Sequence, residues 1–153
     1  MGIDGFNVLI TVESALRGDP VYVCSDGIVR DLSLAYSSYK PSDKFEKAVI
    51  LIKRAIEGIQ PGEATIYLDS PVSGSGVLAS RMRSILGEVA EVRTSKRVDA
   101  EVASHEVAAS SDSRIISKAS CVVDLPRFAM ESAGLSPKPL FPSKGLFGGY
   151  TDW

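Results

Sequence analysis

Apolar and polar positions follow a helical period most clearly over residues 43–59. One face of this stretch is apolar and comprises Phe45, Ala48, Val49, Ile52, Ile56 and Ile59. The opposite face is charged and comprises Lys44, Glu46, Lys47, Lys53, Arg54 and Glu57. The pattern predicts an amphipathic helix with Ser42 as its N-cap and Pro61–Gly62 as its end.

The rest of the chain alternates short apolar runs with further amphipathic runs. The expected strands are 2–4, 64–69, 88–93, 106–112 and 121–125, and the other expected helices are 76–86, 98–105, 113–119 and 126–134. Strands that alternate with helices form parallel βαβ units. The sequence therefore predicts the α/β class: a Rossmann-like, three-layer α/β/α domain with a mainly parallel sheet.

This domain is expected to span residues 1–135, and residues 136–153 are expected to form an irregular C-terminal arm rich in proline and glycine. The apolar residues of the arm are Leu140, Phe141, Leu146, Phe147, Tyr150 and Trp153. They are expected to pack back onto the domain, because exposed together they would form a large apolar patch. At the other end, the predicted first strand is either unusually short or begins before residue 1.

Composition narrows the class of protein. No apolar run among the 153 residues is long enough to span a membrane, and the first residues lack the pattern of a signal peptide. Cys24 and Cys121 are expected to be reduced, strand-borne hydrophobes of a cytoplasmic protein. The net charge of −2 provides no basic field over the whole protein, so a nucleic-acid partner would need a local basic patch.

Aspartates occur where the predicted strands end. Asp4, Asp69 and Asp112 each close a strand, Asp99 opens a short helix, and Asp124 lies within the last predicted strand. Ligands of parallel α/β sheets bind beyond the carboxyl ends of the strands, so these acids are expected to converge if their strands are neighbours. The alternative for each acid alone is a simple helix cap.

Crowded carboxylates repel one another and need a cation at neutral pH. Mg²⁺ and Mn²⁺ prefer oxygen ligands, and such sites hydrolyse phosphodiesters without histidine. The chain has a single histidine, His105, which is expected to be a structural residue at a helix end.

A serine- and glycine-rich loop, "SPVSGSG" at residues 70–76, follows Asp69. Ser73 or Ser75 could cap the next helix. Alternatively, backbone N–H groups and the hydroxyls of Ser70, Ser73 and Ser75 could hold a phosphate. No lysine follows the loop, so it is not a P-loop of the Walker type.

Basic residues lie near these motifs. Arg30 follows an expected turn at Asp26–Gly27 and could pair with Asp31 or bind a phosphate near Asp4. The others are Arg81, Arg83, Arg93, Lys96 and Arg97. They could grip a nucleic-acid backbone or simply form a solvated face.

Three segments resemble the motifs of NYN domains, which belong to the PIN-like nucleases. The segments are "IDGFN" at 3–7, "SKRVDAEVAS" at 95–104 and "AASSDSRII" at 108–116. The sequence as a whole also looks like an uncharacterised archaeal family of that PIN-like group. The resemblance implies an α/β/α domain whose clustered acids bind Mg²⁺ or Mn²⁺ and cleave RNA.

Residue by residue, Asp4, Asp99 and Asp112 match the metal-binding acids of that group, and Asp69 matches its middle-strand acid less specifically. Asn7 matches the asparagine that orients the site, and Ser111 and Ser113 flank Asp112 as in the family's fourth-strand signature. The matching helix usually carries a further acid, for which Glu101 and Glu106 are candidates.

The resemblance leaves two other functions open. The domain could be a nucleic-acid-binding or interaction module that lacks the chemistry, or a nucleotide-binding domain that uses loop 70–76. A homo-oligomer is compatible with all three functions.

Overall fold

The computed structural model describes residues 1–32 and 38–140 of the chain. Its central sheet is parallel and four-stranded, in the order β5-β4-β1-β6. The strands are β1 (Gly2–Asp4), β4 (Thr65–Asp69), β5 (Glu91–Ser95) and β6 (Ala108–Ala109). Consecutive residues of β4 alternate between the two faces of this sheet: Ile66 and Leu68 join one hydrophobic core, whereas Tyr67 joins another.

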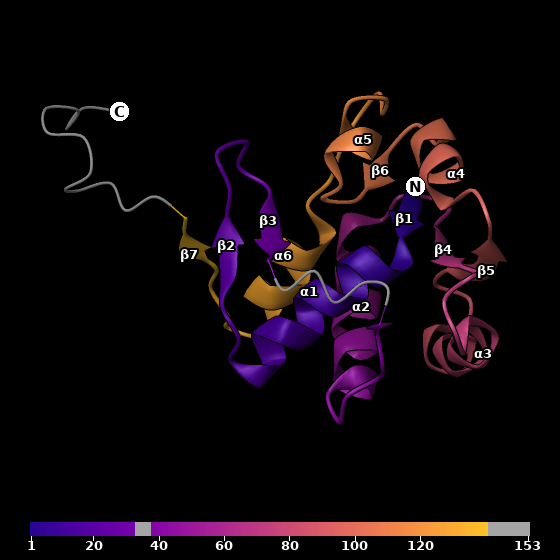
Figure 1. Ribbon diagram of the computed structural model, residues 1–153, viewed down its shortest axis with the longest axis horizontal. Helices are drawn as coiled ribbons and strands as arrows, with labels where there is room; N and C mark the ends of the chain where they lie inside the picture. Colours follow the sequence, from indigo (N-terminus) through magenta and orange to yellow (C-terminus); the bar gives the residue numbers. More distant parts are fainter. Residues whose placement is uncertain (33–37, 141–153) are drawn as a thin grey trace, which may run out of the picture.

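Helices cover both faces of the sheet (Figure 1). The larger core lies under α1 (Gly5–Arg17), α2 (Phe45–Ile59), α3 (Ser75–Leu86) and α6 (Leu125–Ser132). The smaller core lies under α4 (Val98–Ser104) and α5 (Ser113–Ile116). This arrangement confirms the predicted α/β class with a mainly parallel sheet and helices on either side. Within the described ranges, no helix has the length and apolar character needed to cross a bilayer.

Helix α1 begins directly after β1, and glycine makes this sharp junction possible. A Cβ atom on Gly5 would come within 2.6 Å of Leu68 Cδ2 and 2.8 Å of the Tyr67 carbonyl oxygen. A larger residue at position 5 would therefore push the first turn of α1 away from β4. Because α1 starts there, Asp4 is held at the end of β1 while Asn7 faces the same edge of the sheet.

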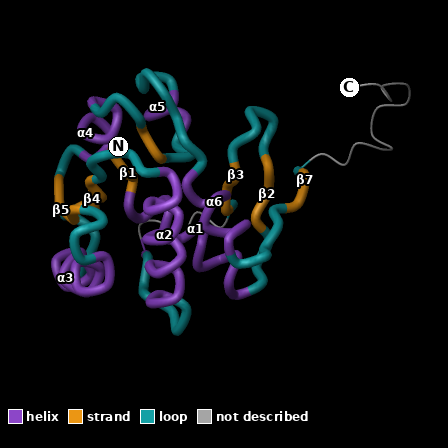
Figure 2. Tube along the Cα trace, turned by 180° about the vertical axis from the view of Figure 1, so that it is seen from behind, coloured by secondary structure: helices purple, strands orange, loops and turns teal. Residues whose placement is uncertain are grey.

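A second, three-stranded sheet, in the order β3-β2-β7, packs against α1 and α6, which lie between it and the first sheet (Figure 2). It consists of β2 (Val21–Val23), β3 (Val29–Asp31) and β7 (Lys138–Pro139). The predicted turn at Asp26–Gly27 connects β2 and β3, with Gly27 at a φ of 82°. Strand β7 belongs to the segment that was predicted to be an irregular arm, and residues 141–153 of that arm lie outside the described residues.

The predicted strand at 121–125 is wrong. Only Val122 bridges to Ala108, and Asp124 instead accepts hydrogen bonds from the Arg127 N–H at the start of α6 and from the Val29 N–H of β3 at 2.9 Å. Neither cysteine lies in a strand: Cys24 is half-buried after β2, and Cys121 is exposed. The apolar run resembles a strand in sequence, but the Asp124 carboxylate is used to start α6 and to anchor β3.

The predicted serine caps are also wrong. Lys44 is the N-cap residue of α2, and the Ser42 hydroxyl instead accepts from the Lys44 N–H at 3.1 Å, one turn earlier. Gly74 is the N-cap residue of α3, with no side-chain cap. The predicted C-terminal ends of two helices agree with the structure, since α2 stops before Pro61 and α6 stops before Gly134.

Candidate functional site

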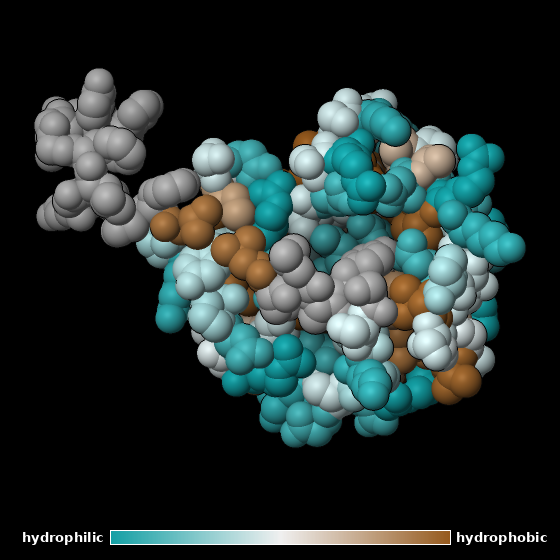
Figure 3. Space-filling model, in the orientation of Figure 1, coloured by the Kyte–Doolittle hydropathy of each residue, from teal (hydrophilic) through white to brown (hydrophobic). Residues whose placement is uncertain are grey.

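A cavity of about 770 Å³ opens at the carboxyl ends of the parallel strands. Figure 3 shows this side of the molecule hollowed between the β2–β3 hairpin and α5, with hydrophilic atoms in the hollow. The lining residues are Asp4, Asn7, Ile10, Thr11, Arg30, Asp31, Leu32, Asp69, Lys96, Arg97, Val98, Asp99, Ala100, Ser111, Asp112, Arg114 and Lys118.

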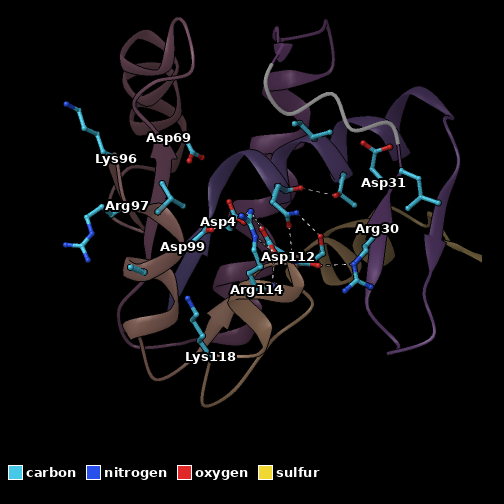
Figure 4. Close-up of a pocket in the computed structure, with 17 residues that line it drawn as sticks. Asp4, Arg30, Asp31, Asp69, Lys96, Arg97, Asp99, Asp112, Arg114 and Lys118 are labelled. Atoms are coloured by element: carbon cyan, nitrogen blue, oxygen red, sulfur yellow. Dashed lines mark hydrogen bonds and ion pairs between the residues drawn. The ribbon is translucent and has the colours of Figure 1, made fainter.

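The connections of the sheet explain why the cavity forms at this edge. The chain leaves β1 for the face covered by α1 and α2, and it leaves the neighbouring strand β6 for the opposite face covered by α5. Loops that depart to opposite faces leave a crevice between them, which is where ligands of open α/β sheets bind. The structure brings Asp4, Asp69, Asp99 and Asp112 to this crevice from separate elements (Figure 4).

Asp4 is the most buried acid of the cavity, with 3% of its surface exposed. Its Oδ2 accepts a hydrogen bond from the Ser110 hydroxyl at 2.8 Å. Its Oδ1 is buried and has no hydrogen-bond partner in the described part of the chain. Burial, and then the negative charges of Asp69, Asp99 and Asp112, raise the pKa of Asp4 from 3.8 to about 7, and the Ser110 hydrogen bond opposes this rise.

Asn7 and two serines hold the loop that carries Asp112. The Asn7 amide donates to the Ser111 hydroxyl at 2.7 Å and accepts from the Ser111 N–H at 3.0 Å. The Ser110 hydroxyl, besides donating to Asp4, accepts from the Asp112 N–H at 3.0 Å. These bonds join the end of β1 and the first turns of α1 to the loop after β6, so Asp4 and Asp112 keep a defined relation. Sequence reasoning missed Ser110.

Asp112 and Asp99 share an arginine. Arg114 Nη2 lies 2.8 Å from Asp112 Oδ2 and 3.6 Å from Asp99 Oδ2. The Arg114 backbone N–H also donates to Asp112 Oδ1 at 2.8 Å, so Asp112 caps α5 as well as facing the cavity. Hydrogen bonding from Arg114 lowers the pKa of Asp112, and Asp112 is therefore ionised at neutral pH.

Arg30 belongs to the wall formed by β3. Its Nε donates to the Ser111 carbonyl oxygen at 2.9 Å, and its terminal nitrogens pair with Asp26 at 2.7 and 2.8 Å. Arg30 thus pairs with Asp26. One interpretation of the sequence expected it to pair with Asp31 instead. Arg30 still lines the cavity together with Asp4, at the place where a phosphate contact was predicted.

Further cations stand around the opening. Figure 4 shows Lys96 and Arg97 extending outward from the acids, with Lys118 below them. All three line the cavity. The arrangement has negative side chains in the centre and positive side chains around them, which suits a ligand that brings both a cation and phosphate groups.

Several predicted site residues are not brought to this cavity. Ser70, Ser73 and Ser75 lie in the loop between β4 and α3 but are absent from the lining, and the Ser75 hydroxyl donates to the Ser70 carbonyl oxygen at 3.3 Å. Ser113 is exposed in α5 and is likewise absent from the lining, as are Glu101 and Glu106.

The remaining basic residues of the sequence motifs lie outside the cavity lining and make contacts within the protein. The Arg81 guanidinium lies 4.2 Å from the centre of the Phe45 ring. Arg83 donates to the Val92 carbonyl oxygen, and Arg93 pairs with Glu91 at 2.7 Å. The helix-end position predicted for His105 is confirmed, and its Nε2 lies 2.8 Å from the Tyr67 hydroxyl.

The chemistry of the donors fits Mg²⁺ or Mn²⁺, because the acids of the cavity offer oxygen alone. In residues 1–32 and 38–140, no three His, Cys, Asp or Glu side chains already stand in an arrangement that would hold a metal ion. Arg114 instead occupies the space between Asp99 and Asp112. The residue types therefore fit such a cation, and the side-chain arrangement would have to close around it.

Sequence reasoning also missed Asp31, Arg114 and Lys118 among the lining residues. Arg114 stands two positions after Asp112, and Asp31 follows Arg30 directly, so both were adjacent to residues already singled out. Their sequence neighbours could have suggested them. Lys118 had no such signal, because its position depends on how α5 ends.

The fold and the site together define an α/β domain with an acid-lined cavity at the carboxyl edge of a parallel sheet. Residues 1–128 match the family described as Domain of unknown function (DUF5616), and the chain belongs to that family. No solved structure gives a significant match to the chain.

A similar protein is the uncharacterized protein MJ0935 of Methanocaldococcus jannaschii. It is 41% identical over 137 residues, which cover 84% of this chain and 64% of that protein. The chain thus spans just under two thirds of the length of this relative.

Proposed function

We propose that the domain is a Mg²⁺- or Mn²⁺-dependent ribonuclease of PIN-like type, which hydrolyses phosphodiester bonds at its aspartates. The observation that carries this proposal is the Asp4 carboxylate, which is 3% exposed and has one oxygen without a partner in the described chain. A buried, unpaired carboxylate oxygen beside three other acids is costly for the fold. A bound divalent cation would remove that cost.

In this proposal, Asp4, Asp99 and Asp112 hold the cation, and Asp69 binds it directly or through water. When bound, the cation would acidify a water molecule and polarise a phosphoryl oxygen. Asp4 and Asp112 are already joined through Ser110, which holds two of the acids in place before binding. Removing the Asp4 proton, whose pKa is about 7, is part of the binding reaction.

The basic side chains around the acids would bind the substrate. Arg30 stands on the β3 side, and Lys96 and Arg97 stand on the β5 side of the same cavity. Cations on both sides of the acids would hold the phosphates that flank the bond to be cleaved. RNA is the proposed substrate because of the NYN-like motifs around Asp4, Asp99 and Asp112.

The nucleotide-binding alternative has less support. Its serines lie outside the cavity lining, and one of them is used within its own loop. The second alternative is a module that binds RNA without cleaving it. The basic residues around the cavity support this alternative as well as the nuclease, and the two functions differ in whether the bound RNA is cut.

The test is cleavage of a labelled single-stranded RNA in the presence of Mn²⁺ or Mg²⁺. We expect Asp112→Asn to abolish cleavage, while Glu131→Gln, which alters an exposed acid of α6 outside the cavity, leaves it unchanged. RNA that is bound but not cut by the folded wild type would favour the binding module. Equal cleavage by wild type and Asp112→Asn would refute the assigned site.

A further inference from the structure

Arg114 stands out among the cations of the cavity because it contacts two of the acids that the proposed function assigns to the metal. One of its nitrogens, Nη2, lies 2.8 Å from Asp112 Oδ2 and 3.6 Å from Asp99 Oδ2. Its Nε also donates to Asp112 Oδ1 at 3.3 Å. The guanidinium thereby joins the first turn of α4 to the first turn of α5.

We propose that the Arg114 guanidinium is a cation of the protein itself that a metal ion displaces. It holds Asp99 and Asp112 until a divalent cation replaces it, and then it binds a phosphate of the substrate. The proposal rests on the proposed function, since it assigns a second role at the same site. It makes Arg114 a residue that influences metal affinity and substrate affinity in opposite directions.

Exposure makes the displacement feasible. The Arg114 side chain is 74% exposed, and the Asp99 side chain is 46% exposed. Ion pairs that open to water gain little free energy, because water and salt screen them. A divalent cation with several carboxylate ligands would therefore outcompete a single exposed guanidinium.

Asp4 shows that Arg114 neutralises the acids only in part. Asp4 Oδ1 is buried without a hydrogen-bond partner in the described residues, although Arg114 serves Asp99 and Asp112 in the same cavity. Asp4 is 3% exposed and the Arg114 side chain is 74% exposed, so a cation bound to Asp4 would lie deeper than the guanidinium. The site thus has an outer position, which Arg114 occupies, and an inner position at Asp4.

Displacement would leave Arg114 at the mouth of the cavity. Its backbone is fixed in α5, and the Arg114 N–H remains bonded to Asp112 Oδ1. A guanidinium beside a metal-bound carboxylate is repelled by the metal charge and attracted by a phosphate, which its planar donors bind with two parallel hydrogen bonds. Figure 4 shows Arg114 pointing into the group of acids, on the side where Lys118 also stands.

A purely structural salt bridge predicts something else. If Arg114 only ties α4 to α5, its removal should loosen the loops that carry Asp99 and Asp112. Metal binding and substrate binding would then both weaken. Opposite effects on the two affinities therefore distinguish the proposed role from a structural one.

The experiment compares wild type, Arg114→Ala and Arg93→Ala by Mn²⁺ titration calorimetry and by RNA-cleavage kinetics. Arg93 is the matched control, because it forms a comparably exposed ion pair, with Glu91, outside the cavity. For Arg114→Ala we expect roughly two- to fivefold tighter Mn²⁺ binding, the size of an exposed ion pair. Its KM should rise roughly tenfold or more, as for a lost charged hydrogen bond. Arg93→Ala should match wild type.

Mn²⁺ binding by Arg114→Ala that is unchanged or weaker, with clear binding by wild type, would overturn the role of Arg114 and leave the proposed function standing. No binding by either folded protein would refute the metal site itself, and the role of Arg114 with it. Arg114→Lys gives a second reading: it keeps the charge and loses the planar donors, so its Mn²⁺ affinity should stay near wild type while its KM rises.

Discussion

Asp4 and Glu13 are two buried acids nine positions apart, one just before α1 and one near its end. They differ in how many hydrogen-bond partners the fold gives their carboxylate oxygens. Glu13 in α1 is completely buried, and Asp4 just before α1 is 3% exposed. The oxygens of Glu13 accept hydrogen bonds from the Tyr39 hydroxyl and, at 2.7 Å, from the Ser42 hydroxyl, and Arg17 lies 3.6 Å away. Asp4 has Ser110 on one oxygen and no hydrogen-bond partner in the described chain on the other.

The comparison teaches that burial alone does not mark a functional acid. Glu13 fastens the segment before α2 onto α1, and its partners satisfy it within the fold. Asp4 lines a cavity together with other acids, and its buried Oδ1 has no hydrogen-bond partner in the described residues, so the fold alone does not satisfy it. The partners of Glu13 make it a structural contact, whereas Asp4 keeps one oxygen without a partner in the described residues, which is why we propose Asp4 and not Glu13 as a cation ligand.

The largest effect on stability is expected for Asp4→Asn. Since the fold raises the pKa of Asp4 from 3.8 to about 7, the native state holds its proton more tightly, and its contribution to stability is lost as pH rises from about 4 to 7. The neutral amide avoids this loss. In metal-free buffer at pH 8, Asp4→Asn should gain up to about 4 kcal/mol of unfolding free energy.

Urea unfolding at pH 8 and at pH 4 measures this gain. At pH 4 the gain should nearly vanish, because the wild-type carboxyl is then protonated in the native state. A variant that is less stable than wild type at pH 8 would show that Asp4 is satisfied in the fold, as Glu13 is.

Glu13→Gln should act in the opposite direction. The amide cannot accept from both Tyr39 and Ser42 as the carboxylate does, and the charge facing Arg17 is lost. We expect a loss of roughly 2 kcal/mol of stability in urea unfolding. Mn²⁺ affinity should be unchanged, and a change in it would mean that the two acids are not independent.

Ser110→Ala should have the smallest effect, and it tests the link between Asp4 and Asp112. Asp4 Oδ2 loses its donor and the Asp112 N–H loses its acceptor, at a cost of about 1 kcal/mol. Because the Ser110 hydrogen bond lowers the pKa of Asp4, removing it should raise that pKa further. An NMR titration of the Asp4 carboxyl carbon would detect the shift; a pKa that falls or stays constant would contradict the assigned bond.

The sequence could predict those elements in which apolar and polar positions differ clearly along a short stretch of chain. Helix α2 was predictable because its apolar and charged faces differ, and β4 because a buried apolar run ends on Asp69. Helix α1 was not among the predicted elements, although it is one of the longest. It is buried over most of its length, so its sequence shows little contrast between faces.

The candidate site was predictable in its acids and not in its contacts. The positions of Asp4 and Asp69 follow from where parallel strands end. The roles of Ser110 and Arg114 depend on contacts between side chains of different elements. The periodicity of apolar and polar positions within one element does not predict such contacts. The same limit explains Ser42, which was predicted to cap α2 and instead contacts Glu13.

A Mn²⁺ titration by calorimetry at pH 8, on wild type, Asp4→Asn and Glu13→Gln, tests the central claim most directly. Wild type and Glu13→Gln should bind with the same affinity, and Asp4→Asn should bind roughly a hundredfold more weakly or not at all. Equal binding by wild type and Asp4→Asn, or no binding by folded wild type, would contradict the account of Asp4 as a cation ligand.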